Sequence, residues 1–258
     1  MKSNRAFSLP EVVLACSLMS LLMLVLAQTL GFGQMVFRTT SGNTDTTALL
    51  RKVSQVLERD SLQTSFKASD VANTPGNEGG AFWCLSNLDS SGQPHYKADG
   101  SPFWSRNIIF YLVVPNNHQS LFGRTCPLSL VGPNGHLQDC PHKVMVRMEV
   151  DSGTATNYAN ETTEEGLLTP AAASSYFKKP NGYDVSGLYS VAPGIKEVSV
   201  IGQLLLDFEV IKSAGAFNMD LRAVSLKRAE RVVNTSGPMY NSPFTMSFTQ
   251  SIYPQVKN

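Results

Sequence analysis

Apolar residues are concentrated in one long stretch close to the start of the chain. No residue from Val12 to Phe37 is charged, a span of 26 residues counted from position 12 to position 37. At a rise of about 1.5 Å per residue, a helix of that span is about 39 Å long, enough to cross a hydrocarbon layer of about 30 Å. Lys2 and Arg5 precede the run, and Arg38 follows it. By the positive-inside rule, we expect the basic leader to stay in the cytoplasm and the rest of the chain to be exported.

A second helical pattern follows the apolar run. From Thr44 onward, apolar residues recur at the spacing of one helix face, and we expect this face to pack on the protein's own sheet. The face consists of Leu49, Leu50, Val53, Val56 and Leu57. Residues 39–43 are poor helix formers, so we expect a kink or a melted turn between the two patterns. Together the two patterns predict an N-terminal helix over residues 7–66 whose first half spans a membrane.

Strand patterns fill the second half of the chain. Residues 67–105 are rich in Gly, Ser, Asn, Asp and Pro, which indicates a long ordered loop pinned by aromatic side chains. Apolar or alternating runs then predict five strands, at 107–114, 143–150, 198–212, 221–227 and 244–253. Residues 151–193 are polar and turn-rich, which suggests an insertion. We therefore expect an α+β fold, with a long N-terminal helix packed on an antiparallel β-sheet that carries long decorated loops.

Composition excludes several classes of protein. The 258 residues are 42% hydrophobic and include 13 Phe, 8 Tyr and 2 Trp, so disorder of the whole chain is excluded. With one apolar run of membrane-spanning length, a polytopic membrane protein is excluded too. The formal net charge is +1, which does not favour nucleic-acid binding by bulk electrostatics. The small basic cluster at residues 227–231 is more typical of a solvated strand end than of a DNA-binding patch.

Glu11 stands at the entrance to the apolar run. A carboxylate costs roughly 2.5–3.5 kcal/mol on insertion scales if it reaches the bilayer centre, so it calls for a partner. The nearest cation would be an α-amino group created by cleavage just before it. A cleavable secretory signal, which has a shorter apolar region and an Ala-x-Ala-like cleavage site, gains nothing from such a residue.

Residues 5–15, RAFSLPEVVLA, resemble the prepilin signal of type IV pilins and type II secretion pseudopilins. The resemblance is specific over residues 5–30. It implies that a prepilin peptidase cuts between Ala6 and Phe7, that Phe7 is then N-methylated, and that Glu11 becomes the fifth mature residue. It also implies that Glu11 pairs in a filament with the Phe7 amine of a neighbouring subunit. Ala6 stands where the family usually has Gly.

The resemblance implies a minor pilin or pseudopilin, a structural subunit that primes, caps or decorates a filament and is not an enzyme. Its parts would be a leader at 1–6, the helix at 7–66 and a head at 67–258. It would reside in the bacterial inner membrane as a single-pass protein with its head in the periplasm. Its expected partners are other pilin or pseudopilin subunits, the prepilin peptidase and the membrane, with no specific nucleic acid and no cofactor. The alternative is a membrane-anchored, exported binding or enzymatic domain unrelated to filaments.

Three of the four cysteines lie in the part that we expect to be exported, where disulfides form. Cys126 and Cys140 flank the turn signal at 132–135, so we favour a disulfide between them. Pairing of Cys84 with either one remains an alternative, and one cysteine is left over. Cys16 lies in the apolar run, where it serves as a small apolar residue.

A metal site is the competing interpretation of the same region. It would use Cys126, His136, Cys140 and His142, but this spacing fits no standard zinc module, so we expect no metal. We expect the four histidines to be surface residues, namely His95, His118, His136 and His142. The sequence contains no common hydrolase, nucleotide-binding or calcium-loop motif, so it offers no catalytic residue.

Overall fold

Helix α1 spans Leu9–Leu62 in the computed structural model, which describes residues 8–89, 91–122, 131–137, 140–153, 156–224 and 245–254. The helix is continuous through residues 39–43, so the expected break there is wrong. At the end of this stretch the hydroxyl of Thr44 donates to the carbonyl of Thr40 at 2.9 Å, so the helix itself satisfies this side chain. The chain divides into two compact units, Met1–Thr44 and Asp45–Asn258.

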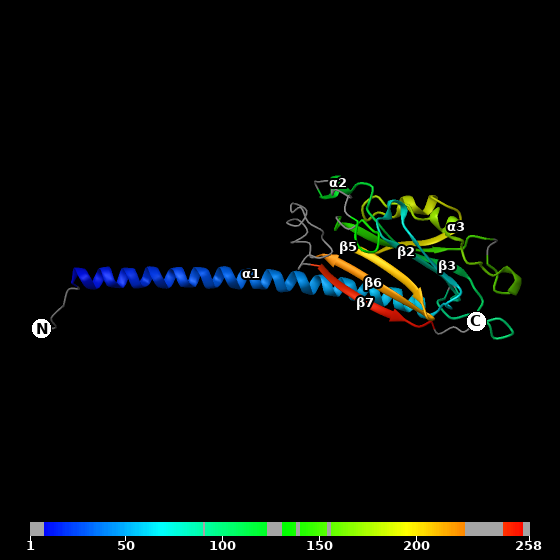
Figure 1. Ribbon diagram of the computed structural model, residues 1–258, viewed down its shortest axis with the longest axis horizontal. Coiled ribbons are helices and arrows are strands. Elements are labelled where there is room, and N and C mark those ends of the chain that lie inside the picture. The colour runs from blue at the N-terminus through cyan, green and yellow to red at the C-terminus, as the bar shows by residue number, and fades with distance from the viewer. Residues whose placement is uncertain are drawn as a thin grey trace. The chain divides into compact units, whose positions relative to one another are not determined.

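The second unit is built on a sheet of seven antiparallel strands, counted over the described residues, in the order β1-β2-β3-β4-β5-β6-β7 (Figure 1). Each strand pairs with its successor along the chain, so the sheet is a meander. The strands are β1 Ser69–Asn73, β2 Gly80–Ser86, β3 Arg106–Val113, β4 Lys143–Val150, β5 Ile195–Ser213, β6 Ala216–Val224 and β7 Thr245–Ile252. The short helices α2, His118–Phe122, and α3, Pro170–Ser174, lie in the connections. The predicted α+β class is confirmed.

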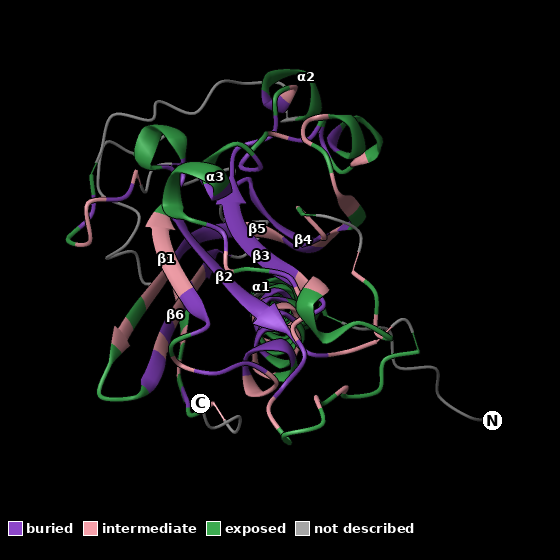
Figure 2. Cartoon of the chain, turned by 90° about the vertical axis from the view of Figure 1, so that its right-hand side faces the viewer, coloured by how far each residue is buried: buried purple, intermediate pink, exposed green. Residues whose placement is uncertain are grey.

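Two strands lie where the sequence predicted only a loop. β1 and β2 fall within residues 67–105, and every residue of β2 is buried. A strand that is buried on both faces shows no alternation of polar and apolar residues, so a short one has no period-two pattern. Figure 2 shows β2 and β3 buried along most of their length.

One face of the sheet packs against the second half of α1. Leu50, Val53 and Leu57 are buried there, as the helical pattern predicted. The helix approaches β5 closely at Gly202, where an added Cβ would lie 2.6 Å from Cγ2 of Val53. Real Cβ contacts are not that short, so the absence of a side chain at Gly202 allows the helix to dock at this distance.

The other face of the sheet is covered by the segment that looked like an insertion. Within residues 151–193, Leu168, Tyr176 and Phe177 pack on side chains of β2, β3 and β4. The indole N–H of Trp83 in β2 donates to the carbonyl of Leu168 at 2.8 Å, which satisfies the one polar atom of a buried side chain. The 151–193 segment is therefore part of the core of this unit.

Candidate functional site

The amino end of α1 is closed by a contact between Ser8 and Glu11. The backbone N–H and the hydroxyl of Ser8 both donate to Oε2 of Glu11, each at 2.9 Å. The carbonyl of Ser8 accepts the first helical hydrogen bonds, from the N–H groups of Glu11 at 3.0 Å and Val12 at 3.2 Å. Glu11 thus makes the carboxylate half of a capping box, while the Ser8 hydroxyl donates to the same carboxylate instead of accepting from a backbone N–H. Pro10 fits the first turn because a helix start leaves its first N–H groups unbonded.

This cap gives Glu11 a role that the sequence analysis missed. The Ser-x-x-Glu spacing before an apolar run is a recognised helix-start signal and could have revealed it. A carboxylate at this position also interacts favourably with the positive end of the helix dipole. Glu11 therefore combines two properties, an acceptor that closes the helix and a negative charge at the entrance to the apolar run.

The first part of α1 carries an apolar surface on all sides. The large apolar residues between Val12 and Phe37 are exposed. Among the described residues, α1 is the one helix that is both long enough and apolar enough to cross a membrane. A helix that is apolar all round is normally buried, either inside a protein or in a bilayer. By length and composition, this segment could therefore enter a lipid layer or pack against other protein chains.

The hydroxyl groups within the apolar run are satisfied by the helix itself. Ser17 donates to the carbonyls of Val13 and Leu14, and Ser20 donates to that of Cys16 at 2.8 Å. Further along the run, the hydroxyl of Thr29 donates in the same way to the carbonyl of Val25 at 2.7 Å. Because an unsatisfied polar group costs several kcal/mol in hydrocarbon, these bonds make the segment compatible with a bilayer.

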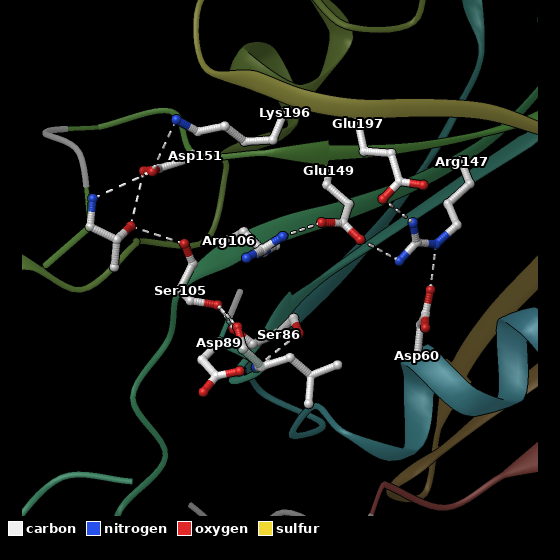
Figure 3. A network of polar contacts seen from close by, with 12 residues as sticks. Asp60, Ser86, Asp89, Ser105, Arg106, Arg147, Glu149, Asp151, Lys196 and Glu197 are labelled. Carbon is white, nitrogen blue, oxygen red and sulfur yellow. Dashed lines mark hydrogen bonds and ion pairs between the residues drawn. The ribbon is translucent and has the colours of Figure 1, made fainter. Parts of the chain in front are cut away.

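The carboxyl end of α1 is fixed to the sheet by a buried ion pair between Asp60 and Arg147 (Figure 3). Asp60 accepts from Nε of Arg147 in β4 at 2.6 Å and from Nε of Arg59 at 2.7 Å. Burial alone would lower the pKa of Arg147, but Asp60 and Glu149 raise it above its usual value. The guanidinium therefore stays charged, and it holds the end of the helix against β4.

Glu149 extends this network along β4. One of its oxygens accepts from Nη2 of Arg147 at 2.7 Å, and the other accepts from Arg106 in β3. Burial alone would raise the pKa of Glu149, but its hydrogen bonds to Arg106 and Arg147 hold it below the usual value. Arg147 and Glu149 of β4 thus belong to one network with the end of the helix, and the charged positions of this alternating strand are buried instead of solvated.

Three of the four histidines are buried, so the expectation of surface histidines is wrong for them. His136 places Nδ1 2.8 Å from Oδ1 of Asp207 and Nε2 3.1 Å from Oδ1 of Asn73. Both ring nitrogens of His136 are thus engaged within the fold. His118 and His142 are buried at another place in the head, while His95 is half-buried and packs edge-on against Phe103.

The residues of the predicted disulfide and metal sites are only partly brought together. Cys140 and His142 lie beside His118, and His136 is in the separate contact with Asp207. The tight turn expected between the cysteines is confirmed, since the N–H of Gly132 donates to the carbonyl of His136 at 2.8 Å. Cys126 lies outside the described residues, so its disulfide with Cys140 remains a prediction.

The other two cysteines, Cys84 and Cys16, lie in described elements of the structure. Cys84 is buried in β2 and forms no disulfide among the described residues, and burial together with the nearby Asp60 raises the pKa of its thiol. Cys16 is exposed on the apolar part of α1. The raised pKa of Cys84 is the opposite of what a reactive thiol has, which suits a packing role for this residue.

The processing residues Ala6 and Phe7 lie outside the described residues, as does the basic cluster at 227–231. Comparison with protein-family models, with curated proteins and with solved structures finds no match to this chain. Its function is therefore argued from the helix and from the chemistry of its amino end.

Proposed function

We propose that the protein is a minor pilin or pseudopilin. In this proposal, a prepilin peptidase cuts between Ala6 and Phe7, Phe7 is N-methylated, and the first half of α1 anchors the chain in the bacterial inner membrane with its head in the periplasm. The chain then joins other subunits to prime, cap or decorate a type IV pilus or a type II secretion pseudopilus. The observation that carries the proposal is the carboxylate of Glu11 at the start of an exposed apolar helix.

The exposed apolar run is consistent with a helix that lies first in a membrane and later in a filament. In the membrane, lipid covers the run and the helix satisfies its own hydroxyl groups. In a filament, the same surfaces of neighbouring subunits would cover one another in place of lipid. The second half of α1 is buried on the sheet, so the helix that enters the filament is continuous with an element of the head's core.

Glu11 would set the register between subunits. Both hydrogen bonds from Ser8 end on Oε2, so Oε1 is the oxygen that we assign to the Phe7 amine of a neighbour. A subunit docked at another height would leave a buried carboxylate without a cation, which costs roughly 3–5 kcal/mol. The pair therefore selects one register even though it adds little net stability when it is made.

The test is the mass of the mature chain. The protein is produced in cells with and without a prepilin peptidase, and its N-terminal peptide is identified by mass spectrometry. We expect a chain that starts at N-methylated Phe7 only where the peptidase is present. A chain that still starts at Met1, or one cut after Ala27 or later, contradicts the proposal and returns the protein to the class of anchored exported domains.

A further inference from the structure

Two side chains converge on the same ring nitrogen of His118. Sγ of Cys140 lies 3.4 Å from its Nε2, and Nδ1 of His142 lies 2.9 Å from the same atom. An imidazole nitrogen carries either one hydrogen or one in-plane lone pair, so it makes one good hydrogen bond. Hydrogen bonding alone does not account for both approaches, whereas a metal ion shared by the three atoms does.

We propose that the head binds one zinc ion through His118, Cys140 and His142. All three ligand atoms lie within 4.8 Å of one another. Zinc–nitrogen bonds of about 2.0–2.1 Å and zinc–sulfur bonds of about 2.3 Å place ligands of a tetrahedral ion about 3.3 Å apart for N–N and about 3.6 Å apart for N–S. The observed 2.9 and 3.4 Å are each shorter by less than about half an ångström, so a small outward movement admits the ion.

The donor set and its burial favour zinc over the common hard cations. A thiolate with imidazoles suits zinc and other soft or borderline metals, whereas calcium and magnesium prefer oxygen ligands. All three side chains are buried, and one thiolate reduces the charge of the bound dication to +1, which lowers the cost of burying it. The proposed site differs from the sequence-based expectation of no metal. That expectation did not consider His118, because its distance along the chain from Cys140 and His142 gave no reason to combine them.

The ion would act as a cross-link. His118 begins α2 after the end of β3, while Cys140 and His142 directly precede β4. Zinc would therefore join both ends of the segment between β3 and β4. A disulfide of Cys140 with Cys126 would consume the thiolate, so the two predictions exclude each other.

The first test measures metal in the full chain, purified in detergent without chelators. We expect about one zinc ion per chain, and cobalt substitution to give the thiolate-to-cobalt charge-transfer band of a sulfur-ligated ion. His118→Ala and His142→Ala should each weaken zinc binding roughly tenfold or more, since even residues outside the ligand set change affinity by that factor. His95→Ala and Cys84→Ala are the matched controls and should keep the metal.

A second variant separates loss of a ligand from loss of folding. Cys140→His supplies a different zinc ligand, so it should retain zinc and lose the charge-transfer band, a result that an unfolded chain cannot give. A wild-type chain with folded near-ultraviolet circular dichroism that takes up no zinc would overturn the proposal. So would peptide mapping that finds Cys126 and Cys140 joined in the purified protein.

Discussion

Ser8 gives both of its hydrogens to one oxygen of Glu11, from the backbone N–H and from the hydroxyl, each at 2.9 Å. The contact completes the start of α1 with a residue to which the resemblance to pilins assigns a role between subunits. The cap needs an acceptor at this position, while pairing with an amine needs a negative charge. The two roles are therefore separable by mutation.

Glu11→Gln should abolish incorporation into filaments while leaving the helix cap in place. Glutamine keeps an oxygen that can accept from Ser8, since either residue completes a capping box, but it cannot neutralise a neighbour's amine. The measurement is the amount of the chain in sheared filaments relative to the membrane fraction, in cells that carry the assembly machinery. Ser8→Ala is the control, because it removes the hydroxyl bond to Glu11 but keeps the negative charge, so it should still be incorporated. Equal incorporation of Glu11→Gln and wild type would refute the register role.

Arg147→Met should destabilise the head far more than Arg59→Met. Both arginines donate to Asp60 at nearly the same distance, but the side chain of Arg147 is 8% exposed and that of Arg59 is 58% exposed. Removing the buried partner leaves buried carboxylates uncompensated and should cost about 3–5 kcal/mol, whereas a surface pair contributes about 0–1 kcal/mol. Urea unfolding in detergent, followed by tryptophan fluorescence, measures the free energy of unfolding of both variants. Equal effects of the two variants would show that the network is solvated.

The head should lose stability in acid because of Glu149. Its pKa is lowered in the folded protein, against burial, by Arg106 and Arg147, so its contribution is fully present above the unfolded value of 4.5 and is lost as the pH falls through the lower folded value. Unfolding free energies measured from pH 7 down to about 3 should therefore fall less steeply in Glu149→Gln than in wild type. Exposed Glu161→Gln serves as the control and should follow the wild-type curve. A Glu149→Gln curve parallel to wild type would contradict this assignment.

Gly202→Ala should weaken the docking of α1 on the sheet. The new Cβ would meet Cγ2 of Val53 at 2.6 Å, and overpacking of this kind costs about 1–3 kcal/mol. The double variant Gly202→Ala with Val53→Ala should cost less than the sum of the single changes, because Val53→Ala removes the clashing methyl group. Gly187→Ala is the control, since nothing lies within 4 Å of its added Cβ. Additive free energies of unfolding would mean that the contact does not limit docking.

Local patterns in the sequence were enough to predict the elements with a strong periodic signal. The apolar run with its entrance carboxylate predicted the exposed first half of α1, and the spacing of Leu50, Val53 and Leu57 predicted the face that packs on the sheet. The alternating run of β4 predicted a strand. These features depend on residues within a few positions of one another, which is the range over which sequence periodicity carries information.

Other features depend on contacts between distant segments, and only the tertiary structure decided them. β2 has no alternation because the 151–193 segment covers its second face, and Arg147 of β4 can be buried because Asp60 of α1 meets it there. His118 meets Cys140 and His142 across more than twenty residues, a partnership that no local spacing encodes. The sequence alone determined the character of the segments that have a clear period, whereas the fold determined which polar groups meet, because burial and pairing are properties of two surfaces and not of one.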